Sequence, residues 1–96
     1  MFLVRDVFQT KPGMAKELVK KFKKTFPVME QEGFKNVRIM TDAVAGFWTV
    51  VLEYSVNHLD DMEKTKGFTS RPDVVEAMKG YMDLVAGGRR EIFRIE

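Results

Sequence analysis

The chain has 96 residues, of which 45% are apolar and 31% charged, and its net charge is +2 at neutral pH. This composition excludes intrinsic disorder and indicates one globular domain covering residues 1–96. Because the chain has no cysteine, disulfides, thiol catalysis and thiolate metal sites are excluded as well.

The first third of the chain predicts a strand followed by a long amphipathic helix. Residues 2–9 are rich in β-branched and aromatic side chains and end before Pro12-Gly13, which breaks a strand. Apolar residues then recur at helical spacing, at positions 14, 18, 19, 22 and 26, with lysines between them at 16, 20, 21, 23 and 24. We expect Pro27 to kink or briefly interrupt this helix and Gly33 to cap it, so that it ends near Glu32.

The remainder predicts two neighbouring strands, a broken pair of helices and a last strand. Residues 34–41 alternate as a strand does, residues 47–55 form a denser apolar run, and residues 42–46 are short enough for a hairpin loop. A helix is predicted from Asn57 to Gly67, and a second from an N-cap at Ser70 to Val85. Gly87-Gly88 should end it before alternation resumes at residues 90–95.

This order predicts an α+β ferredoxin-like βαββαβ fold, in which a four-stranded antiparallel sheet carries its helices on one face. The opposite face should remain apolar, because residues 47–55 are apolar at nearly every position. An apolar face of this extent marks an interface or a ligand site. We expect a second copy of the chain to cover it, giving a homodimer through the sheet faces.

Two features bear on location. The N-terminus reaches Arg5 after Met1 and three further apolar residues and lacks the layout of a signal peptide, so a cytoplasmic location is expected. The longest apolar stretch, residues 43–52, is about half of what crosses a bilayer, and no membrane segment is expected.

Several segments together resemble the dimeric α+β barrel superfamily, which includes NIPSNAP-like proteins and antibiotic-biosynthesis and haem-degrading monooxygenases. They are the opening strand, the turn at residues 11–16 into a lysine-rich helix, Gly46-Phe47-Trp48, and the ending Gly87-Gly88-Arg89-Arg90-Glu91-Ile92-Phe93-Arg94. The resemblance implies two sheets back to back in a homodimer, with a small-molecule pocket in each subunit between sheet and helices.

The resemblance does not extend to haem degradation. The haem-degrading members look like having an Asn near the end of the first strand, where this chain has Asp6. They also look like having a Trp and a His on the second helical region. That region carries Phe68 and Met78 here. We therefore expect no cofactor.

Asp6 is the candidate catalytic residue. It alternates with Phe2, Val4 and Phe8, so a carboxylate is predicted to share an otherwise apolar face, where burial would raise its pKa and suit it to proton abstraction. The alternatives are a structural ion pair with Arg5, Arg38 or Arg94 from neighbouring strands, or a place at the margin of the sheet.

The candidate substrate-binding residues combine flat apolar groups with cations. Phe8, Trp48 and Tyr54 provide the aromatic walls that pockets use, although core or dimer packing needs the same residues. Arg5 and Arg94 are candidate anion-stabilising partners. His58 beside Asp60 and Asp61 offers too few converging ligands for a metal site, and no metal is expected.

Three functions remain open at this point. The first is a homodimer with a pocket for a small organic molecule, working as a cofactor-independent monooxygenase or related proton-transfer enzyme. The second is a dimeric ligand-binding or interaction protein without chemistry. The third is an RNA-binding module, which shares the element order, but the lysine run belongs to the outer helix face behind the sheet, so no nucleic-acid partner is expected.

Overall fold

The computed structural model describes the backbone of all 96 residues and every side chain except those of Lys64 and Thr65. In chain order its elements are β1 (Phe2–Thr10), α1 (Ala15–Gln31), β2 (Lys35–Thr41), β3 (Thr49–Val56), the 3-10 turn η1 (Leu59–Glu63), α2 (Lys64–Thr69), α3 (Pro72–Ala77), the 3-10 turn η2 (Tyr81–Asp83) and β4 (Val85–Arg94).

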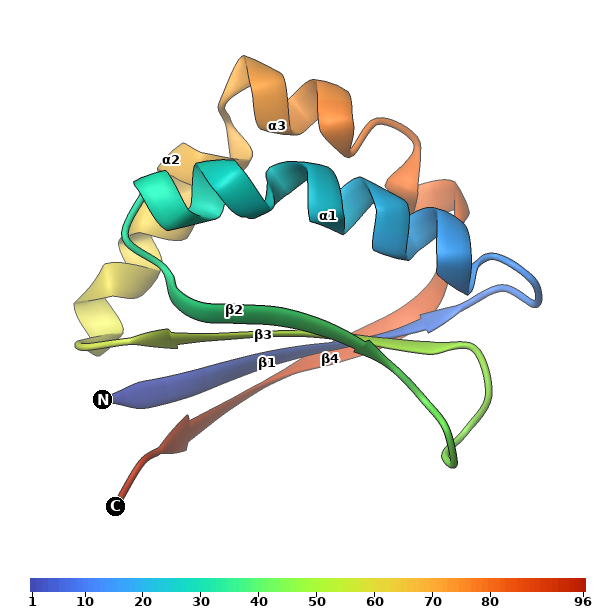
Figure 1. Cartoon of the computed structure of the whole chain (residues 1–96), viewed down its shortest axis with the longest axis horizontal. Coiled ribbons are helices and arrows are strands. Elements are labelled where there is room, and N and C mark those ends of the chain that lie inside the picture. The colour runs from blue at the N-terminus through green and yellow to red at the C-terminus, as the bar shows by residue number, and fades with distance from the viewer.

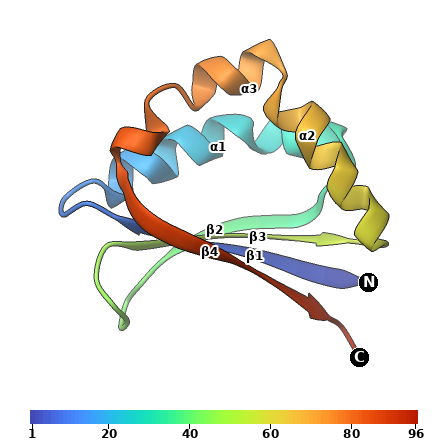
Figure 2. The ribbon, with the colours of Figure 1, turned by 180° about the vertical axis from the view of Figure 1, so that it is seen from behind.

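The four strands form one antiparallel sheet in the order β2-β3-β1-β4. All helices lie on one side of it, and the other side carries no element of the chain (Figure 1). The view from behind shows the same two layers (Figure 2). This confirms the predicted α+β ferredoxin-like fold. None of the helices in the part of the chain that the structure describes has the length and hydrophobicity to cross a membrane.

The core lies between α1 and the strands. Even-numbered residues of β1 and β3 face the helices, as the register of Val4 with Tyr54 and of Asp6 with Leu52 shows. Leu18 and Phe22 of α1 are buried against this face, as the predicted helical stripe requires. The helix passes through Pro27 and ends before Gly33, whose φ of +89° is the left-handed conformation that glycine adopts most easily.

The second helical region differs from the prediction. The first predicted helix does not stop at Gly67, because α2 continues to Thr69. The second is a short helix that ends at Ala77, and Gly80, at a φ of +80°, separates it from η2. Val85 is in β4 rather than in a helix.

Gly87 and Gly88 also lie within β4, where they were predicted to stop a helix. Both glycines are in the strand because they pair with β1, where Gly88 lies opposite Phe8 and Gly87 lies opposite Gln9. A Cβ on Gly88 would lie 2.6 Å from the carbonyl oxygen of Val7, so the two backbones approach more closely than any other residue permits.

The β2–β3 hairpin loop is longer than predicted. Phe47 and Trp48 have φ values of +64° and +55°, outside the strand region, and β3 begins only at Thr49. The backbone N–H of Thr49 donates to the Asp42 carboxylate at 3.0 Å, which closes the loop. The loop hangs from the sheet on the side away from the helices (Figures 1 and 2).

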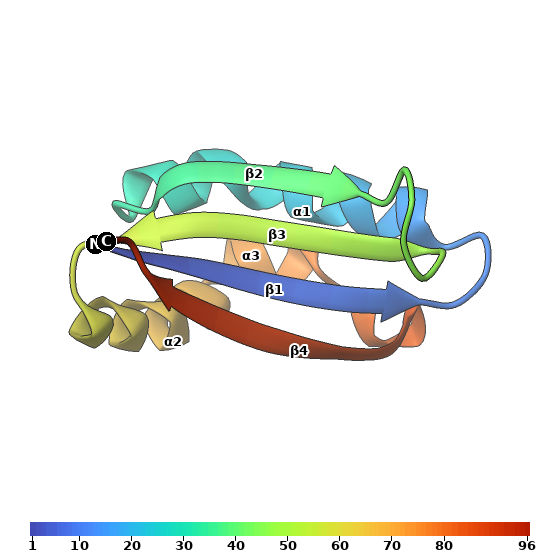
Figure 3. The ribbon, with the colours of Figure 1, turned by 90° about the horizontal axis from the view of Figure 1, so that it is seen from below.

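The helix-free face is more polar than the sequence indicated. It does present Leu3, Val7, Met40, Val51 and Phe93, but ion pairs run across its middle. The Glu53 side chain, 2% exposed, accepts hydrogen bonds from Arg5 at 2.8 Å and Arg38 at 2.7 Å. Seen from this side, the four strands lie uncovered (Figure 3).

Candidate functional site

A cavity of about 510 Å³ lies between the helix-facing side of the sheet and the helices. Such a volume is typical of sites for small organic molecules. The strands provide one wall and α1 another, and the segment from α2 to η2 closes the remainder. Its lining residues are Asp6, Phe8, Phe22, Thr25, Met29, Phe34, Leu52, Tyr54, Phe68, Thr69, Val74, Val75, Met78, Lys79, Gly80, Tyr81, Met82 and Arg90.

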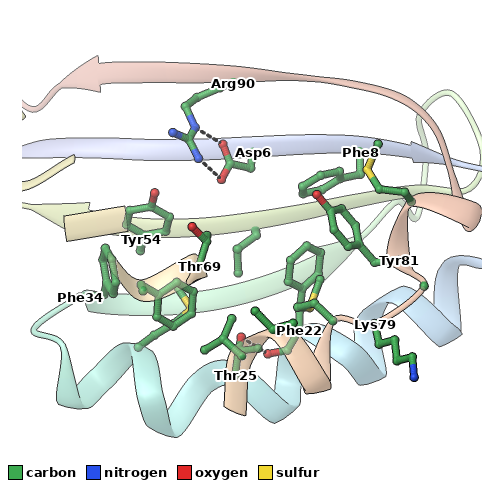
Figure 4. Close-up of a pocket in the computed structure, with 18 residues that line it drawn as sticks. Asp6, Phe8, Phe22, Thr25, Phe34, Tyr54, Thr69, Lys79, Tyr81 and Arg90 are labelled. Atoms are coloured by element: carbon green, nitrogen blue, oxygen red, sulfur yellow. Dashed lines mark hydrogen bonds and ion pairs between the residues drawn. The ribbon is translucent and has the colours of Figure 1, made fainter. Parts of the chain in front are cut away.

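Most of this wall is aromatic or aliphatic. The Phe8 and Phe22 rings lie with their centroids 5.2 Å apart. Phe34 meets Tyr54 edge to face at 4.9 Å, at the end of the cavity away from Phe8 (Figure 4). These contacts fix flat apolar surfaces with few rotatable bonds, which suits the wall to planar apolar ligands.

An ion pair stands out against this apolar wall. Asp6 of β1 lies directly opposite Arg90 of β4 in the strand register. Arg90 donates from Nε to Oδ1 of Asp6 at 2.6 Å and from Nη2 to Oδ2 at 3.1 Å, so the ion pair is bidentate (Figure 4). The hydrogen bonds to Asp6 raise the pKa of Arg90 and hold its charge beside the carboxylate.

Tyr54 lies at the same end of the cavity as this pair (Figure 4). Only 2% of the residue is exposed. Burial, followed by the negative charge of Asp6, raises the pKa of Tyr54 to about 12, although Arg90 acts in the opposite direction. The phenol therefore stays protonated at physiological pH and acts as a hydrogen-bond donor.

The structure brings together three of the six predicted site residues. Asp6, Phe8 and Tyr54 all line the cavity. Arg5 lies on the opposite face, bound to Glu53, and Arg94 lies near the end of β4, with its Cζ 5.7 Å from the centre of the Phe2 ring. Trp48 lies in the hairpin loop, beside a separate hollow of about 560 Å³ that includes Lys16.

Sequence reasoning missed Arg90, which pairs with Asp6 in place of the expected Arg5, Arg38 or Arg94. Strand alternation could have identified it, because Arg90 and Arg94 have the same parity within β4. The choice between them depends on the β1–β4 register, which shifts between Gln9 and Thr10. Tyr81 and Thr69 were missed because their segment was assigned the wrong helix boundaries.

Two other sequence features lie apart from the cavity. Among the described residues, no group of three His, Asp or Glu side chains comes close enough to hold a metal ion, and His58 is exposed. Lys16, Lys20, Lys23 and Lys24 are exposed along α1, behind the sheet. Phe47 and Trp48 are in a loop, so they do not form the strand-borne aromatic pair on which an RNA-recognition sheet stacks bases.

The sheet order and the one-sided helices are those of the fold that NIPSNAP-family proteins share with antibiotic biosynthesis monooxygenase-like proteins. Solved structures of both groups superpose on nearly the whole chain. No family model matches the sequence, and no curated protein matches it either.

Three solved structures illustrate the likeness. A NIPSNAP family protein of unknown function from Agrobacterium tumefaciens has a TM-score of 0.86 at 15% identity, over 99% of this chain and 87% of the other. A NIPSNAP domain protein from Burkholderia xenovorans has a TM-score of 0.84 at 10% identity, over 100% and 95%. An antibiotic biosynthesis monooxygenase-like protein from Chloroflexus aurantiacus has a TM-score of 0.76 at 13% identity, over 99% and 93%. At these identities the likeness concerns the fold.

Proposed function

We propose that this protein is a cytoplasmic homodimer in which each subunit binds a small, mostly apolar organic molecule between its sheet and its helices. The observation that carries this proposal is the cavity, whose apolar wall is interrupted at one end by Asp6, Arg90 and Tyr54. A largely apolar wall with a few converging polar groups is the usual composition of a ligand site, because the apolar area provides affinity and the polar groups fix orientation.

The second subunit belongs to the proposal because the helix-free face has no cover within the chain. Its charges have both signs, with Arg5, Arg38 and Arg89 beside Glu53 and Glu91. A two-fold axis would place this mixed face against its own copy, so that cations of one copy meet anions of the other. The apolar side chains between these charges would then be removed from contact with water.

A cofactor-independent monooxygenase or related proton-transfer enzyme is the second candidate for the same cavity. Asp6 favours it, because a carboxylate on an apolar wall is positioned to accept a proton from a bound ligand, while Tyr54 donates to the oxyanion that results. Both Asp6 oxygens accept from Arg90, and each keeps a further lone pair for that proton. Ligand-dependent oxygen uptake that Asp6→Asn abolishes, with binding retained, would support this activity.

Native mass spectrometry of freshly purified protein tests the binding function and reports subunit number and any retained molecule together. Val75→Phe is the matching variant, because Val75 lines the cavity and is 55% exposed, so a larger ring there narrows the space at its solvent edge. Val44→Phe is the control, because Val44 is 96% exposed on the hairpin loop and does not line this cavity. We expect Val75→Phe alone to lose the bound molecule. Equal retention by both variants would place the ligand elsewhere.

A further inference from the structure

The Tyr54 hydroxyl has no hydrogen-bond partner in the part of the chain that the structure describes, although the residue is only 2% exposed. Every fully enclosed side-chain oxygen or nitrogen of the described residues does have a partner. The Tyr54 hydroxyl must therefore border free space, and the space that Tyr54 lines is the cavity. A buried donor without an acceptor is costly, which points to an acceptor that the chain itself does not provide.

Tyr54 can offer only one kind of hydrogen bond to a cavity ligand at physiological pH. Its pKa is raised to about 12 by burial and by Asp6, so the phenol keeps its proton at physiological pH. A group in the cavity that faces this hydroxyl is therefore best matched when it accepts a hydrogen bond.

The charges that face into the cavity balance one another. Arg90 is held by both oxygens of Asp6, which neutralises the pair. Lys79 is exposed, and its amino group points away from the cavity (Figure 4). An ionised ligand would thus lose its hydration without meeting an unpaired cation, at a large cost in free energy, whereas a neutral acceptor loses little.

From these three observations we propose that the ligand is a neutral, mostly apolar molecule that bears a carbonyl-type oxygen, and that Tyr54 donates a hydrogen bond to that oxygen. This inference rests on the proposed function of the cavity. It adds the chemical class of the ligand and names the residue that recognises the ligand's oxygen. Phe34, in edge contact with the Tyr54 ring, holds the phenol in place for this contact.

The test uses 1-tetralone and tetralin, two bicyclic compounds of nearly equal size that differ by one carbonyl group, with 1-naphthoate as the ionised analogue. Binding is followed by NMR titration of the full-length protein. We expect the wild type to bind 1-tetralone roughly two- to tenfold more tightly than tetralin, which is the range of one net hydrogen bond, and 1-naphthoate most weakly. The preference should be the same at pH 6 and pH 9, because Tyr54 stays protonated at both.

Tyr54→Phe removes the hydroxyl and keeps the ring, and since that hydroxyl has no partner the variant is expected to fold, which circular dichroism checks. This variant should bind 1-tetralone more weakly, bind tetralin as the wild type does, and so lose the preference for 1-tetralone over tetralin. Tyr81→Phe is the matched control, because Tyr81 also lines the cavity but at the end near Phe8 (Figure 4). It should leave the preference intact.

The outcomes separate this inference from the proposed function. The inference is wrong if the wild type binds the two bicyclic compounds equally or binds 1-naphthoate most tightly. It is also wrong if the preference survives Tyr54→Phe or disappears in Tyr81→Phe. In each of these cases the cavity remains a binding site. If none of the three compounds binds and no molecule is retained on purification, both the inference and the proposed function are wrong.

Discussion

The carboxylate of Glu53 lies on the helix-free face between two guanidinium groups, where its side chain is 2% exposed. Burial by itself raises the pKa of Glu53, but the hydrogen bonds and charges of Arg38 and Arg5 outweigh it and leave the pKa below its ordinary value of 4.5. Because the folded pKa is the lower one, Glu53 contributes stability above about pH 4.5 and loses it as the pH falls further.

We predict that Glu53→Gln lowers the free energy of unfolding by about 1–2 kcal/mol at pH 7, since the two partly exposed arginines lose their shared anion. At pH 3 the difference between variant and wild type should shrink, because below pH 4.5 the unfolded wild-type chain binds a proton at Glu53 and the ion pairs then contribute less to stability. Urea unfolding at both pH values measures this. A difference of the same size at pH 3 and pH 7 would show that charge is not the cause.

The sequence predicted the position of Asp6 but not its partner. Alternation placed its carboxylate on the same face as Val4 and Phe8, and the structure shows that this face is turned to the helices and lines the cavity. The identity of Arg90 depends on which residue of β4 lies opposite, and that depends on a register shift between Gln9 and Thr10 that no local pattern encodes. The free hydroxyl of Tyr54 was likewise invisible in the sequence, because it depends on what surrounds it in space.

At the scale of elements, the start of β4 shows why local signals failed in the last third of the chain. Two consecutive glycines usually end a helix, and the sequence was interpreted in that way. The structure uses Gly88 for close contact between strands instead, with the Val7 carbonyl oxygen 2.6 Å from where a Cβ would be. The first strand and the long helix were predicted well, because their periodic patterns extend over many residues.

Gly88→Ala is predicted to destabilise the fold by about 1–3 kcal/mol, because the obstacle is backbone and cannot rotate away. Gly87→Ala is the matched control on the same strand, since a Cβ there meets nothing within 4 Å and its backbone needs no left-handed conformation. Thermal unfolding of the two variants compares them directly. Equal melting temperatures would mean that the strands can move apart at no cost.

At the scale of the whole molecule, the sheet has one covered face and one open face, as the sequence predicted (Figure 3). The open face presents apolar side chains, as expected, but Arg5, Arg38 and Glu53 lie on the same face as Val7 and Val51 and form ion pairs across three strands. Strand parity is easy to predict, but cross-strand pairing requires the register of the complete sheet.

Phe93→Glu tests whether this face joins two copies. Phe93 is 46% exposed on the open face, where the Arg5 guanidinium lies 5.4 Å from its ring centre. In the proposed dimer each of the two copies would bury one new carboxylate in the interface. We therefore expect about a tenfold or greater rise in the dissociation constant of the dimer, measured by light scattering at micromolar concentration. Ile92→Glu is the control, at 43% exposure on the opposite face of the same strand. A dimer unaffected by Phe93→Glu, or weakened equally by Ile92→Glu, would exclude this interface.

Strand β1 runs through the middle of both sites, because Asp6 and Phe8 point into the cavity whereas Arg5 and Val7 point to the open face. A single backbone would therefore support the proposed ligand on one side and the proposed partner on the other. If filling the cavity shifts or stiffens that backbone, dimer affinity changes with it, and by thermodynamic reciprocity dimerisation changes ligand affinity by the same factor. If filling the cavity strengthens the dimer, dilution of the protein would then weaken its hold on the proposed ligand.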